Sequence, residues 1–404
     1  MAVVVGKRHT NKSSGKKQDA LSTQALRARA WAIDHALPFW ADNARDSEGG
    51  FYEELSHNYA PNWTAIRRLR VQARQIYTYS FAHELGWYDG LKTADKTLNF
   101  MLEKGFMPDG ERGFIHLLGP DYSIVDARRD LYDHAFYLLA LAWHARVSGR
   151  RSSLALADSL LAFLDNALGA DNGGFLEGLP LDDPRNALRR QNPHMHLLEA
   201  FMALYDASGD EKYLTRAGRI VTLFKKHFFN RDTNTVTEFF HRGWTPARGA
   251  KGKTVEPGHA AEWIWLLGQY ETRTGIDTRR YANGLYKNLS QIPGLYLSDE
   301  LDKDGNTRRA TKRLWVQTEL VKAHLSQAEF GDTAAPRKAA NTLAGILSDY
   351  LKPNGTWTDT LGENGLPIFG PIPTSTFYHI MCMIAESCRC ANIQPLRETR
   401  YARS

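Results

Sequence analysis

The strongest constraint on the fold is an internal repeat, in which a turn cluster followed by an apolar residue, most often aromatic, recurs at a nearly constant interval. The first copy is Asp46-Ser-Glu-Gly-Gly-Phe51, and similar segments follow at 109–114 and 171–175, with weaker ones at 232–236, 294–296 and 354–357. The spacings between the last residues of successive segments are 63, 61, 61, 60 and 61. Such regular self-similarity predicts six copies of one supersecondary unit.

Between the turns the apolar residues recur every three or four positions, which is typical of amphipathic helices. Helical segments are expected at 66–79, 130–147, 196–206, 258–270, 314–329, 338–351 and 376–391. Stop signals such as Ser148-Gly149 and Ser208-Gly209 follow several of them. Each repeat therefore holds two helices and a loop with a short β-hairpin. Twelve helices in six pairs predict an all-α fold, the closed (α/α)6 barrel, and an open superhelix of helix pairs is the alternative.

Composition and charge indicate which part of the chain forms the folded domain and which part forms a tail. With 43% hydrophobic residues the 404-residue chain can form a large core, which excludes intrinsic disorder for its bulk. Residues 1–18 carry five of the lysines and arginines behind the net charge of +6, and we expect a flexible basic tail there. Residues 19–395 are expected to form a single catalytic domain. Its near-neutral charge gives no reason to expect a nucleic-acid partner.

The apolar runs are much shorter than the roughly 20 residues of a membrane span, so no membrane association is expected. The start of the chain lacks the apolar stretch and cleavage site of a signal peptide. The three cysteines, Cys382, Cys388 and Cys390, are an odd number and are interpreted as reduced thiols. These features together predict a cytoplasmic protein, either a monomer or a homodimer.

Four segments place ionisable groups in otherwise apolar helices, where burial is costly without a partner or a function. They begin near Arg74, His194, Glu256 and Phe377, at matching places in different repeats, so closing the barrel would bring them to one mouth. The pairs His196/Glu199 and His259/Glu262 are each three residues apart, so on a helix each pair shares a face. A carboxylate beside a histidine fixes its tautomer and raises its pKa, which suits proton transfer.

Other chemistries are less consistent with the sequence. His194 and His196 are two apart on a helix, where side chains diverge, so we expect no metal site. The segment 247–254 resembles a phosphate-binding loop but lacks the α/β context that such a loop needs, and a mobile basic loop is expected instead. No nucleophile motif for acyl transfer is present. Aromatic residues among Arg, Asn, Glu and His suit a polyhydroxylated ligand.

These motifs in this order resemble the N-acylglucosamine 2-epimerase superfamily, which includes cellobiose 2-epimerases, sulfoquinovose isomerase and the D-mannose isomerases. The resemblance runs from about residue 20 to 392. It is carried by Gln72-Ala-Arg74-Gln75, Tyr132-Asp-His-Ala-Phe136, Asn192-Pro-His-Met-His196-Leu-Leu-Glu199, Pro257-Gly-His259-Ala-Ala-Glu262-Trp263 and Phe377-Tyr-His379. The resemblance implies an (α/α)6-barrel enzyme that needs no metal and no cofactor.

Position by position, the resemblance makes His259 and His379 the catalytic pair. The substrate-binding residues that it implies, with Glu199 included beside His196, are Arg74, Tyr132, Asn192, His196, Glu199, Glu262 and Trp315. By analogy, His379 removes the C2 proton of the opened sugar to give a cis-enediolate, and Arg74 stabilises the developing negative charge. His259, held by Glu262, is expected to open the ring and to move protons among the oxygens.

The start of the last helix separates branches of the family. Cellobiose-type epimerases have a Pro-Trp-Lys-x-Pro-Tyr-His run there, whereas this chain has Ile372-Pro-Thr-Ser-Thr-Phe-Tyr-His379, without that Trp and Lys. The segment looks more like the D-mannose isomerase branch. The resemblance therefore predicts an aldose–ketose isomerase that interconverts D-mannose and D-fructose, with D-lyxose and D-xylulose as further substrates.

Several alternatives stay open. Within the family these are a 2-epimerase of mannose/glucose, N-acylhexosamine or cellobiose type and, less favoured, a sulfoquinovose isomerase. The last would need a further cation in the pocket, for which Arg242, Lys253 and Arg313 are candidates. A glycoside hydrolase on the same barrel would need two facing carboxylates, for which Glu199 and Glu262 are candidates. A sugar-binding or interaction scaffold without catalysis is the remaining possibility.

Overall fold

A computed structural model describes residues 12–181 and 187–396. Of the expected basic tail, residues 1–11 lie outside this range, whereas residues 12–18 belong to the first helix. The described α-helices are α1 (Lys12–Trp31), α2 (Leu37–Asn43), α3 (Leu69–Glu84), α4 (Leu91–Gly105), α5 (Leu131–Ser148), α6 (Arg151–Ala167), α7 (Gln191–Ser208), α8 (Glu211–Leu223), α9 (Pro257–Thr274), α10 (Arg279–Leu289), α11 (Leu314–Glu329), α12 (Ala335–Gly345) and α13 (Phe377–Cys390). A π-helical segment, Ala32–Ala36, joins α1 and α2, so the described chain forms twelve helical units.

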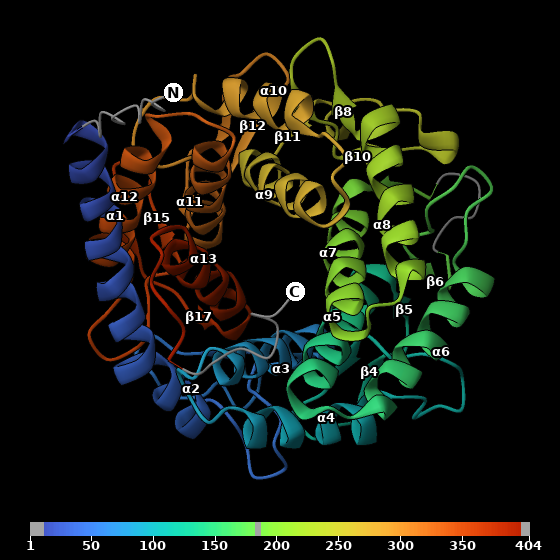
Figure 1. Ribbon diagram of the computed structural model, residues 1–404. Coiled ribbons are helices and arrows are strands. Elements are labelled where there is room, and N and C mark those ends of the chain that lie inside the picture. Colours follow the sequence, from blue (N-terminus) through green and yellow to red (C-terminus); the bar gives the residue numbers. More distant parts are fainter. Residues whose placement is uncertain (1–11, 182–186, 397–404) are drawn as a thin grey trace, which may run out of the picture.

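These units form two concentric rings, which confirms the predicted (α/α)6 barrel (Figure 1). The inner ring is α3, α5, α7, α9, α11 and α13, and each of these helices contacts the next until α13 returns to α3. The outer ring consists of α1 with α2, then α4, α6, α8, α10 and α12. Because α13 contacts α3, the ring is closed, and the open superhelix does not describe this chain.

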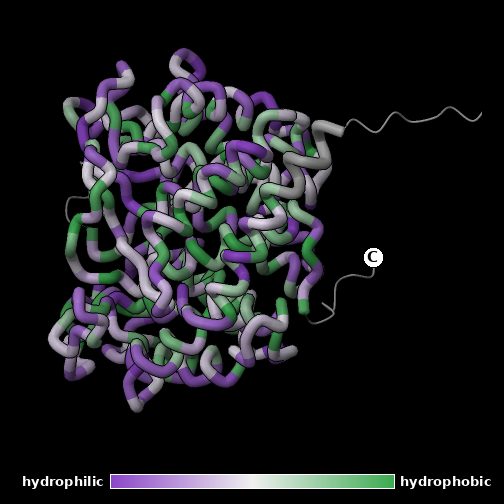
Figure 2. The backbone as a smooth tube through the Cα atoms, turned by 90° about the vertical axis from the view of Figure 1, so that its left-hand side faces the viewer, coloured by the Kyte–Doolittle hydropathy of each residue, from purple (hydrophilic) through white to green (hydrophobic). Residues whose placement is uncertain are grey.

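Burial explains which helices take the inner ring. Along α5 nearly every residue from Leu131 to Ala145 is buried, as expected of a helix covered on all sides. The outer helix α6 buries only one stripe, including Ala157, Leu160 and Leu164. Glycines in the left-handed conformation at Gly149, Gly209 and Gly275 end three inner helices, because glycine adopts this conformation without a steric penalty. In Figure 2 hydrophilic segments are prominent in the loops at the periphery.

Short antiparallel strand pairs join the loops of neighbouring repeats at one end of the barrel. The strands are β1 (Glu54–Leu55), β2 (Arg67–Arg68), β3 (Leu117–Leu118), β4 (Ile124–Asp126), β5 (Arg129–Asp130), β6 (Gly178–Leu179), β7 (Arg189–Arg190), β8 (Phe229–Asn230), β9 (Thr235–Val236), β10 (Phe239–Phe240), β11 (Thr254–Val255), β12 (Glu300–Asp302), β13 (Thr307–Arg309), β14 (Lys312–Arg313), β15 (Thr360–Leu361), β16 (Pro367–Ile368) and β17 (Ile372–Pro373). The pairs β2–β3, β5–β6, β7–β10, β11–β12, β14–β15 and β17–β1 run around the whole ring. In each of these pairs the strand written first precedes an inner helix. All six inner helices therefore begin at this end of the barrel.

Hairpins were expected within the loops, and β3–β4, β8–β9, β12–β13 and β15–β16 are of that kind. The pairing between repeats is the additional feature. Each such pair joins the loop before one inner helix to the loop before the next, so neighbouring repeats satisfy one another's backbone groups.

The recurring turns are held by buried polar side chains of the inner helices. The backbone N–H of Phe51 donates to Gln72 Oε1 (2.7 Å), that of Phe114 to His134 Nε2 (3.2 Å) and that of Phe175 to His194 Nε2 (3.0 Å). Gln317 Oε1 accepts from the backbone of Leu297 in the same way (2.9 Å). His194 is therefore part of a repeated structural contact, and burial lowers its pKa to about 4.

The first and last repeats meet through a buried aromatic cluster. Trp40 of α2 stacks on Trp357 with ring centroids 4.5 Å apart, and Phe377 packs against both. The indole N–H of Trp40 donates to the carbonyl of Gly355 (3.0 Å). This cluster connects segments more than 300 residues apart and helps to close the ring. None of the helices in the described part of the chain is long and apolar enough to span a membrane.

We expect Trp40→Ala to lower the free energy of unfolding by about 3–5 kcal/mol, because it removes a fully buried indole at the ring closure. The measurement is chemical denaturation followed by circular dichroism. Phe369→Ala is the control, since that ring is 91% exposed and should cost no more than about 0.5 kcal/mol. Equal losses in the two variants would contradict the role assigned to the cluster.

Candidate active site

A cavity of about 220 Å³ opens at the end of the barrel where the inner helices begin. Its walls come from all six inner helices and the segments that directly precede them, so they bring together residues that are far apart in the sequence. The lining residues are Arg74, Tyr132, Asn192, His196, Glu256, His259, Glu262, Arg313, Trp315, Ser375, Thr376 and His379. The structure thus gathers eight of the nine residues predicted for the site, and only Glu199 lies elsewhere.

His259 is oriented by a chain of buried hydrogen bonds. Its Nδ1 lies 2.9 Å from Glu238 Oε2, which also accepts from the side-chain amide of Gln191 (2.9 Å). The Gln191 carbonyl oxygen in turn accepts from the Trp263 indole (2.6 Å). Burial alone would lower the pKa of His259, but the charges of Glu238 and Glu256 outweigh it and raise this pKa to about 9. His259 is therefore an imidazolium at neutral pH.

This arrangement corrects one expectation. Glu262 was expected to hold His259, but the carboxylate bonded to that imidazole is Glu238. The residues at 259 and 262 share a helix face, yet the Nδ1 of His259 turns toward the loop that contains Glu238. Glu238 lies in a loop just before β10, outside the helical pattern, so nothing in the sequence identified it as a site residue.

His379 has the opposite ionisation. Its Nδ1 lies 2.8 Å from Glu319 Oε1, and the other oxygen of Glu319 forms an ion pair with Lys322 Nζ at 2.7 Å. Both Glu319 and Lys322 are completely buried. Burial, followed by the positive charges of Arg74 and Lys322, holds the pKa of His379 well below its usual range. With Nδ1–H donating to Glu319, the neutral ring keeps the lone pair of Nε2 for use as a base.

His196 and Glu262 form the base of the cavity. His196 Nδ1 lies 3.4 Å from Glu199 Oε2 and 3.8 Å from Glu262 Oε1. The neighbouring carboxylate was expected to raise the pKa of His196, but burial dominates and lowers it to about 4. Burial and the charge of Glu319 raise the pKa of Glu262 well above its usual range. Both side chains therefore favour the neutral form, in which they can donate hydrogen bonds to hydroxyl groups.

Arg74 places its guanidinium among aromatic rings. Its NH2 donates to the hydroxyl of Tyr132 (2.8 Å), and its central carbon lies 4.2 Å from the ring centroid of Phe136 and 5.3 Å from that of Tyr378. The Nε of Arg74 and the Oδ1 of Asn192 have no hydrogen-bond partner within the described residues. Both atoms are buried beside the cavity that these two residues line.

Trp315 lies between the two histidines. Its ring centroid is 5.5 Å from that of His259 and 5.5 Å from that of His379, with both imidazoles tilted about 40° to the indole. The close approach depends on Gly258, because a Cβ at that position would come within 2.6 Å of the Trp315 ring. An indole in this position provides an apolar surface for a sugar ring beside two groups that transfer protons.

Several lining residues were not predicted from the sequence. For the three candidate cations, the sequence did not show which of them would reach the cavity. Glu256 lies 3.7 Å from His259 Nδ1, and Ser375 and Thr376 form a small-residue wall. Of the three cations considered for an anionic sugar, only Arg313 lines the cavity, where it pairs with Asp299 at 3.3 Å. Arg242 instead pairs with Asp171 on the surface.

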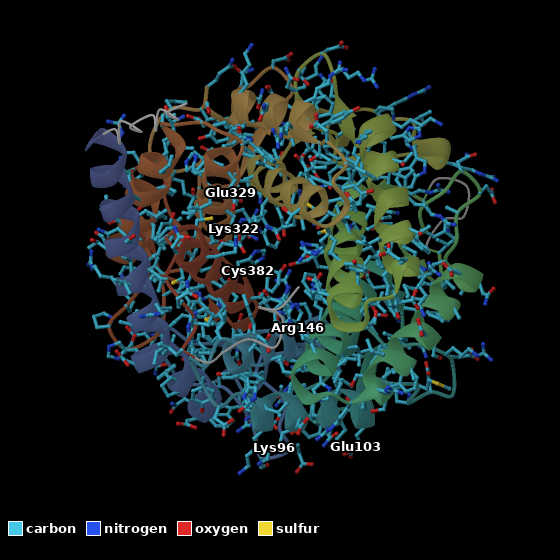
Figure 3. The ribbon with its side chains drawn as sticks, viewed as in Figure 1. Lys96, Glu103, Arg146, Lys322, Glu329 and Cys382 are labelled. Carbon is cyan, nitrogen blue, oxygen red and sulfur yellow. The ribbon has the colours of Figure 1, made fainter. Side chains whose placement is uncertain are left out.

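Glu199 differs from its predicted role. It follows His196 by one helical turn and does not line this cavity. Its Oε2 accepts the hydrogen bond of the Tyr378 hydroxyl, and its side chain lies on the wall of a second cavity at the other end of the barrel. Figure 3 shows the neighbouring Lys322 and Cys382 near the centre of the ring, in contrast to Lys96 and Glu103 at its periphery.

Three clusters at the site have donor atoms close enough to hold a cation. They are His196/Glu199/Glu262, Glu238/Glu256/His259 and Glu262/Glu319/His379, with ligand atoms within 4.8 Å of one another in each. In the third cluster the ammonium of Lys322 already pairs with Glu319. His194 and His196 diverge, as expected from their spacing, and His194 is bonded to the turn at Phe175.

The arrangement can perform proton transfer on a small polar molecule. It presents a neutral imidazole, an imidazolium, a neutral carboxylic acid and a guanidinium around one cavity. These groups supply a base, an acid and stabilisation for an oxyanion, which are the parts that proton abstraction beside a carbonyl requires.

Comparison with known proteins gives consistent results. The family model described as N-acylglucosamine 2-epimerase matches residues 50–383. A mannose-6-phosphate isomerase of Rhizobium meliloti (strain 1021) is 32% identical over 382 residues, which cover 91% of this chain and 97% of the relative. The cellobiose 2-epimerase of Spirochaeta thermophila superimposes with a TM-score of 0.81 at 22% identity, covering 96% of this chain and 99% of that one. A D-mannose isomerase structure gives 0.78 at 20% identity, covering 96% and 100%.

A closed helical barrel with a histidine-rich, sugar-sized cavity defines a class of enzymes that isomerise or epimerise sugars. Within it, this chain belongs to the N-acylglucosamine 2-epimerase family. The family resemblance found in the sequence is thereby confirmed.

The high pKa of His259 can be tested without a substrate. Glu238→Gln removes a negative charge that stabilises the imidazolium, so we expect the pKa of His259 to fall from about 9 toward the ordinary histidine value of about 6.5. The measurement is an NMR titration of labelled histidines, with the signal assigned by its loss in His259→Gln. Glu211→Gln, in the exposed first turn of α8, should leave the pKa unchanged. An unaltered titration in Glu238→Gln would refute the assigned partner.

Proposed function

We propose that the protein is an aldose–ketose isomerase that interconverts D-mannose and D-fructose, and that it also accepts D-lyxose and D-xylulose. The observation that carries the proposal is the pair of histidines of opposite ionisation on one cavity of about 220 Å³. The coarser activity, a sugar isomerase or epimerase, follows from the family and from the relatives described above.

The reaction begins with the ring-opened aldose. His379 Nε2 takes the proton from C2, and the electrons of the C2–H bond form the C1=C2 double bond of an enediolate. The carbonyl oxygen on C1 gains the negative charge and takes a proton from the His259 imidazolium. The Arg74 guanidinium stabilises the charge while it develops. No external reductant is needed, because the step only redistributes electrons within the sugar.

The second half returns the protons. His379 gives its proton to C1, and the neutral His259 takes the proton of the C2 hydroxyl as the C2 carbonyl forms. The product is the ketose, and both histidines regain their starting states. Glu238 and Glu319 keep each imidazole in one tautomer throughout, so that each ring exchanges protons only through its Nε2.

The size and charge of the cavity support a neutral monosaccharide. Ser375 and Thr376 are small and line the cavity near the segment where the cellobiose-type epimerases have a tryptophan. Arg313 is the lining cation nearest to the mouth strands, and it is already compensated by Asp299. A phosphorylated substrate, as in the name of the Rhizobium relative, would have to compete for this pair.

A 2-epimerase is the second candidate, since related cellobiose 2-epimerases share the fold. In that reaction a second group returns the proton to C2 from the opposite face. The imidazolium of His259 is a suitable donor, so isomerase and epimerase differ only in which carbon is reprotonated. A glycoside hydrolase is disfavoured, because Glu199, one of its two candidate carboxylates, does not line the cavity.

Lys322 supports a mechanism without a metal. Its buried ammonium pairs with Glu319, and chiefly the charge of Glu319 raises the pKa of Lys322 against the effect of burial. A fixed cation therefore stands where a divalent ion would otherwise balance the same carboxylates. The need for a cofactor is likewise absent from the proposed proton transfers.

The function is tested by incubating EDTA-treated protein with D-mannose in D2O and following the products by NMR. We expect D-fructose that carries deuterium at C1, because His379 exchanges its proton with solvent during part of the turnovers. D-Glucose deuterated at C2 with little fructose would replace the isomerase by the epimerase. D-Mannose 6-phosphate is the parallel substrate, and conversion of it alone would overturn the neutral-sugar proposal. Loss of activity with EDTA and its recovery with a metal would overturn metal independence.

The two histidines are tested by substitution. His259→Ala and His379→Ala should each lower kcat by about 100-fold or more, since each removes one partner in proton transfer. The melting temperature should change little because both side chains border a cavity. Arg242→Ala, a surface variant outside the cavity, is the control. Near-normal turnover in either histidine variant would show that the assigned proton transfers are wrong.

A further inference from the structure

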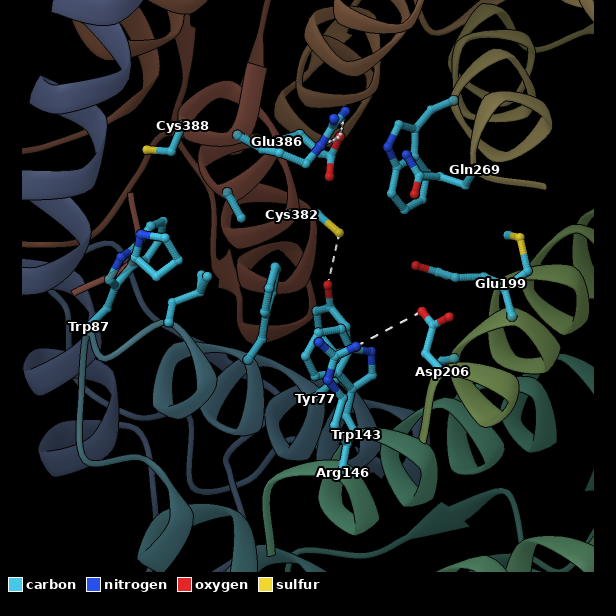
Figure 4. A pocket seen from close by; sticks show the side chains of 18 of the residues that line it. Tyr77, Trp87, Trp143, Arg146, Glu199, Asp206, Gln269, Cys382, Glu386 and Cys388 are labelled. Atoms are coloured by element: carbon cyan, nitrogen blue, oxygen red, sulfur yellow. Dashed lines mark hydrogen bonds and ion pairs between the residues drawn. The ribbon is translucent and has the colours of Figure 1, made fainter. Parts of the chain in front are cut away.

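A second cavity lies at the opposite end of the barrel, around the C-terminal halves of the inner helices. Its volume is about 410 Å³, within the range of small-molecule sites. Figure 4 shows Glu199, Asp206 and Gln269 on one side of it and Tyr77, Cys382 and Glu386 on the other. No residue lines both this lower cavity and the candidate active site.

One helical turn separates the two cavities. On four inner helices a residue of the active-site cavity is followed three positions later by a residue of the lower cavity. These pairs are Arg74/Tyr77, His196/Glu199, Glu262/Trp265 and His379/Cys382. Because residues three apart share a helix face, each helix presents both side chains to the barrel axis. The layer between the cavities is therefore about 5 Å thick.

The charges on the wall of the lower cavity are balanced. Three arginines and three carboxylates line it. Arg273 pairs with Asp206 at 2.6 Å, Arg389 with Glu386 at 2.8 Å, and Arg146 with Glu84 at 3.2 Å. The C-terminal ends of the surrounding helices add a negative partial charge. A strongly anionic ligand would meet no uncompensated cation, so the electrostatics favour a neutral molecule.

The remaining wall combines aromatic rings with hydrogen-bonding groups. Trp143 and Trp265 contribute indole rings, and Gln269 contributes an amide beside the ion-paired arginines. An apolar ligand would leave these polar groups without partners, which is costly. A molecule with many hydroxyl groups can donate to the carboxylates, accept from the arginines and the amide, and pack its C–H face against an indole.

Glu199 has one oxygen that is not used by the fold. Its side chain is only 6% exposed, and its Oε2 receives the Tyr378 hydroxyl and lies 3.4 Å from His196 Nδ1. Within the described residues no hydrogen bond reaches Oε1. Figure 4 shows the Glu199 side chain directed into the lower cavity. Glu199 therefore keeps one oxygen that can accept a hydrogen bond from a hydroxyl group bound in the lower cavity.

We propose that the lower cavity is a second binding site for a neutral polyhydroxylated molecule, such as a monosaccharide or a polyol, with Glu199 as its deepest acceptor. The site is distinct from the candidate active site, and the proposal does not depend on which reaction the active site performs. Since Glu199 also contacts His196 and Tyr378, an occupant of the lower cavity contacts the layer beneath the active site.

The test uses methyl α-D-mannopyranoside, a sugar whose ring cannot open and which is therefore not turned over. Binding is measured by saturation-transfer NMR and calorimetry on wild-type protein, on Ala203→Trp, which fills the lower cavity, and on Ser375→Trp, which fills the active-site cavity. We expect Ala203→Trp to weaken sugar binding at the lower cavity by about tenfold or more. Ser375→Trp should leave binding at the lower cavity unchanged. Ala155→Trp, the same substitution at an exposed position of α6, is the control.

Gln269→Leu is the second variant in case Ala203→Trp unfolds, as judged by its melting temperature. It removes the side-chain amide with little change of volume and should weaken sugar binding at the lower cavity several-fold. The proposal is overturned if Ser375→Trp abolishes all binding while Ala203→Trp and Gln269→Leu retain it. It is also overturned if wild-type protein shows no binding at millimolar sugar that Ala203→Trp or Gln269→Leu weakens. Turnover of D-mannose is not part of the readout, so failure of the proposed reaction would leave this result interpretable.

Discussion

The common direction of the six inner helices is the constraint on which the rest of the structure depends. All six begin at the end of the barrel where the strand pairs join neighbouring loops. Their N-terminal ends therefore converge on one mouth, and their partial positive charges favour negative charge there. In the proposed reaction the enediolate oxygen would form in this region, where its charge is stabilised. The same alignment sorts side chains into layers, so a residue's distance from the start of its helix determines its depth in the barrel.

Neighbouring charges then give two equally buried histidines different ionisation. His259 and His379 each have a carboxylate on Nδ1, at 2.9 and 2.8 Å, and both are almost completely buried. Next to His259 the carboxylates Glu238 and Glu256 prevail, so its pKa rises. Next to His379 the charge of Glu319 is compensated by Lys322, and Arg74 adds a further positive charge, so its pKa falls. The difference thus arises because the charge of Glu319 is compensated by Lys322, whereas Glu238 and Glu256 act together on His259 and outweigh its burial.

The sequence predicted most of the fold because the repeat and the helical periodicity both depend on local residues. The site was predictable where its residues occupy equivalent positions at the start of inner helices, as with Arg74, His196 and Glu262. Glu319 occupies the same position in α11, and comparison of the repeats could have identified it. Glu238 could not be found in this way, because it lies in a loop and reaches His259 only through the tertiary fold. Glu199 was assigned to the active site because three-residue spacing fixes the helix face but leaves the depth open.

The side chains between the two cavities are polar and charged, so the depth of a residue in the barrel determines which charges surround it. An apolar barrel core would be simpler to stabilise, since buried charges are costly unless they are paired. Here Glu319 and Lys322 form a buried ion pair in the middle of the barrel, with Glu199 and Glu262 beside it. Removing Lys322 would leave Glu319 without its counter-charge, so the protonation state of His379 depends on this pair. Because the lower cavity borders the same layer through Glu199, the two cavities share this layer of polar and charged side chains.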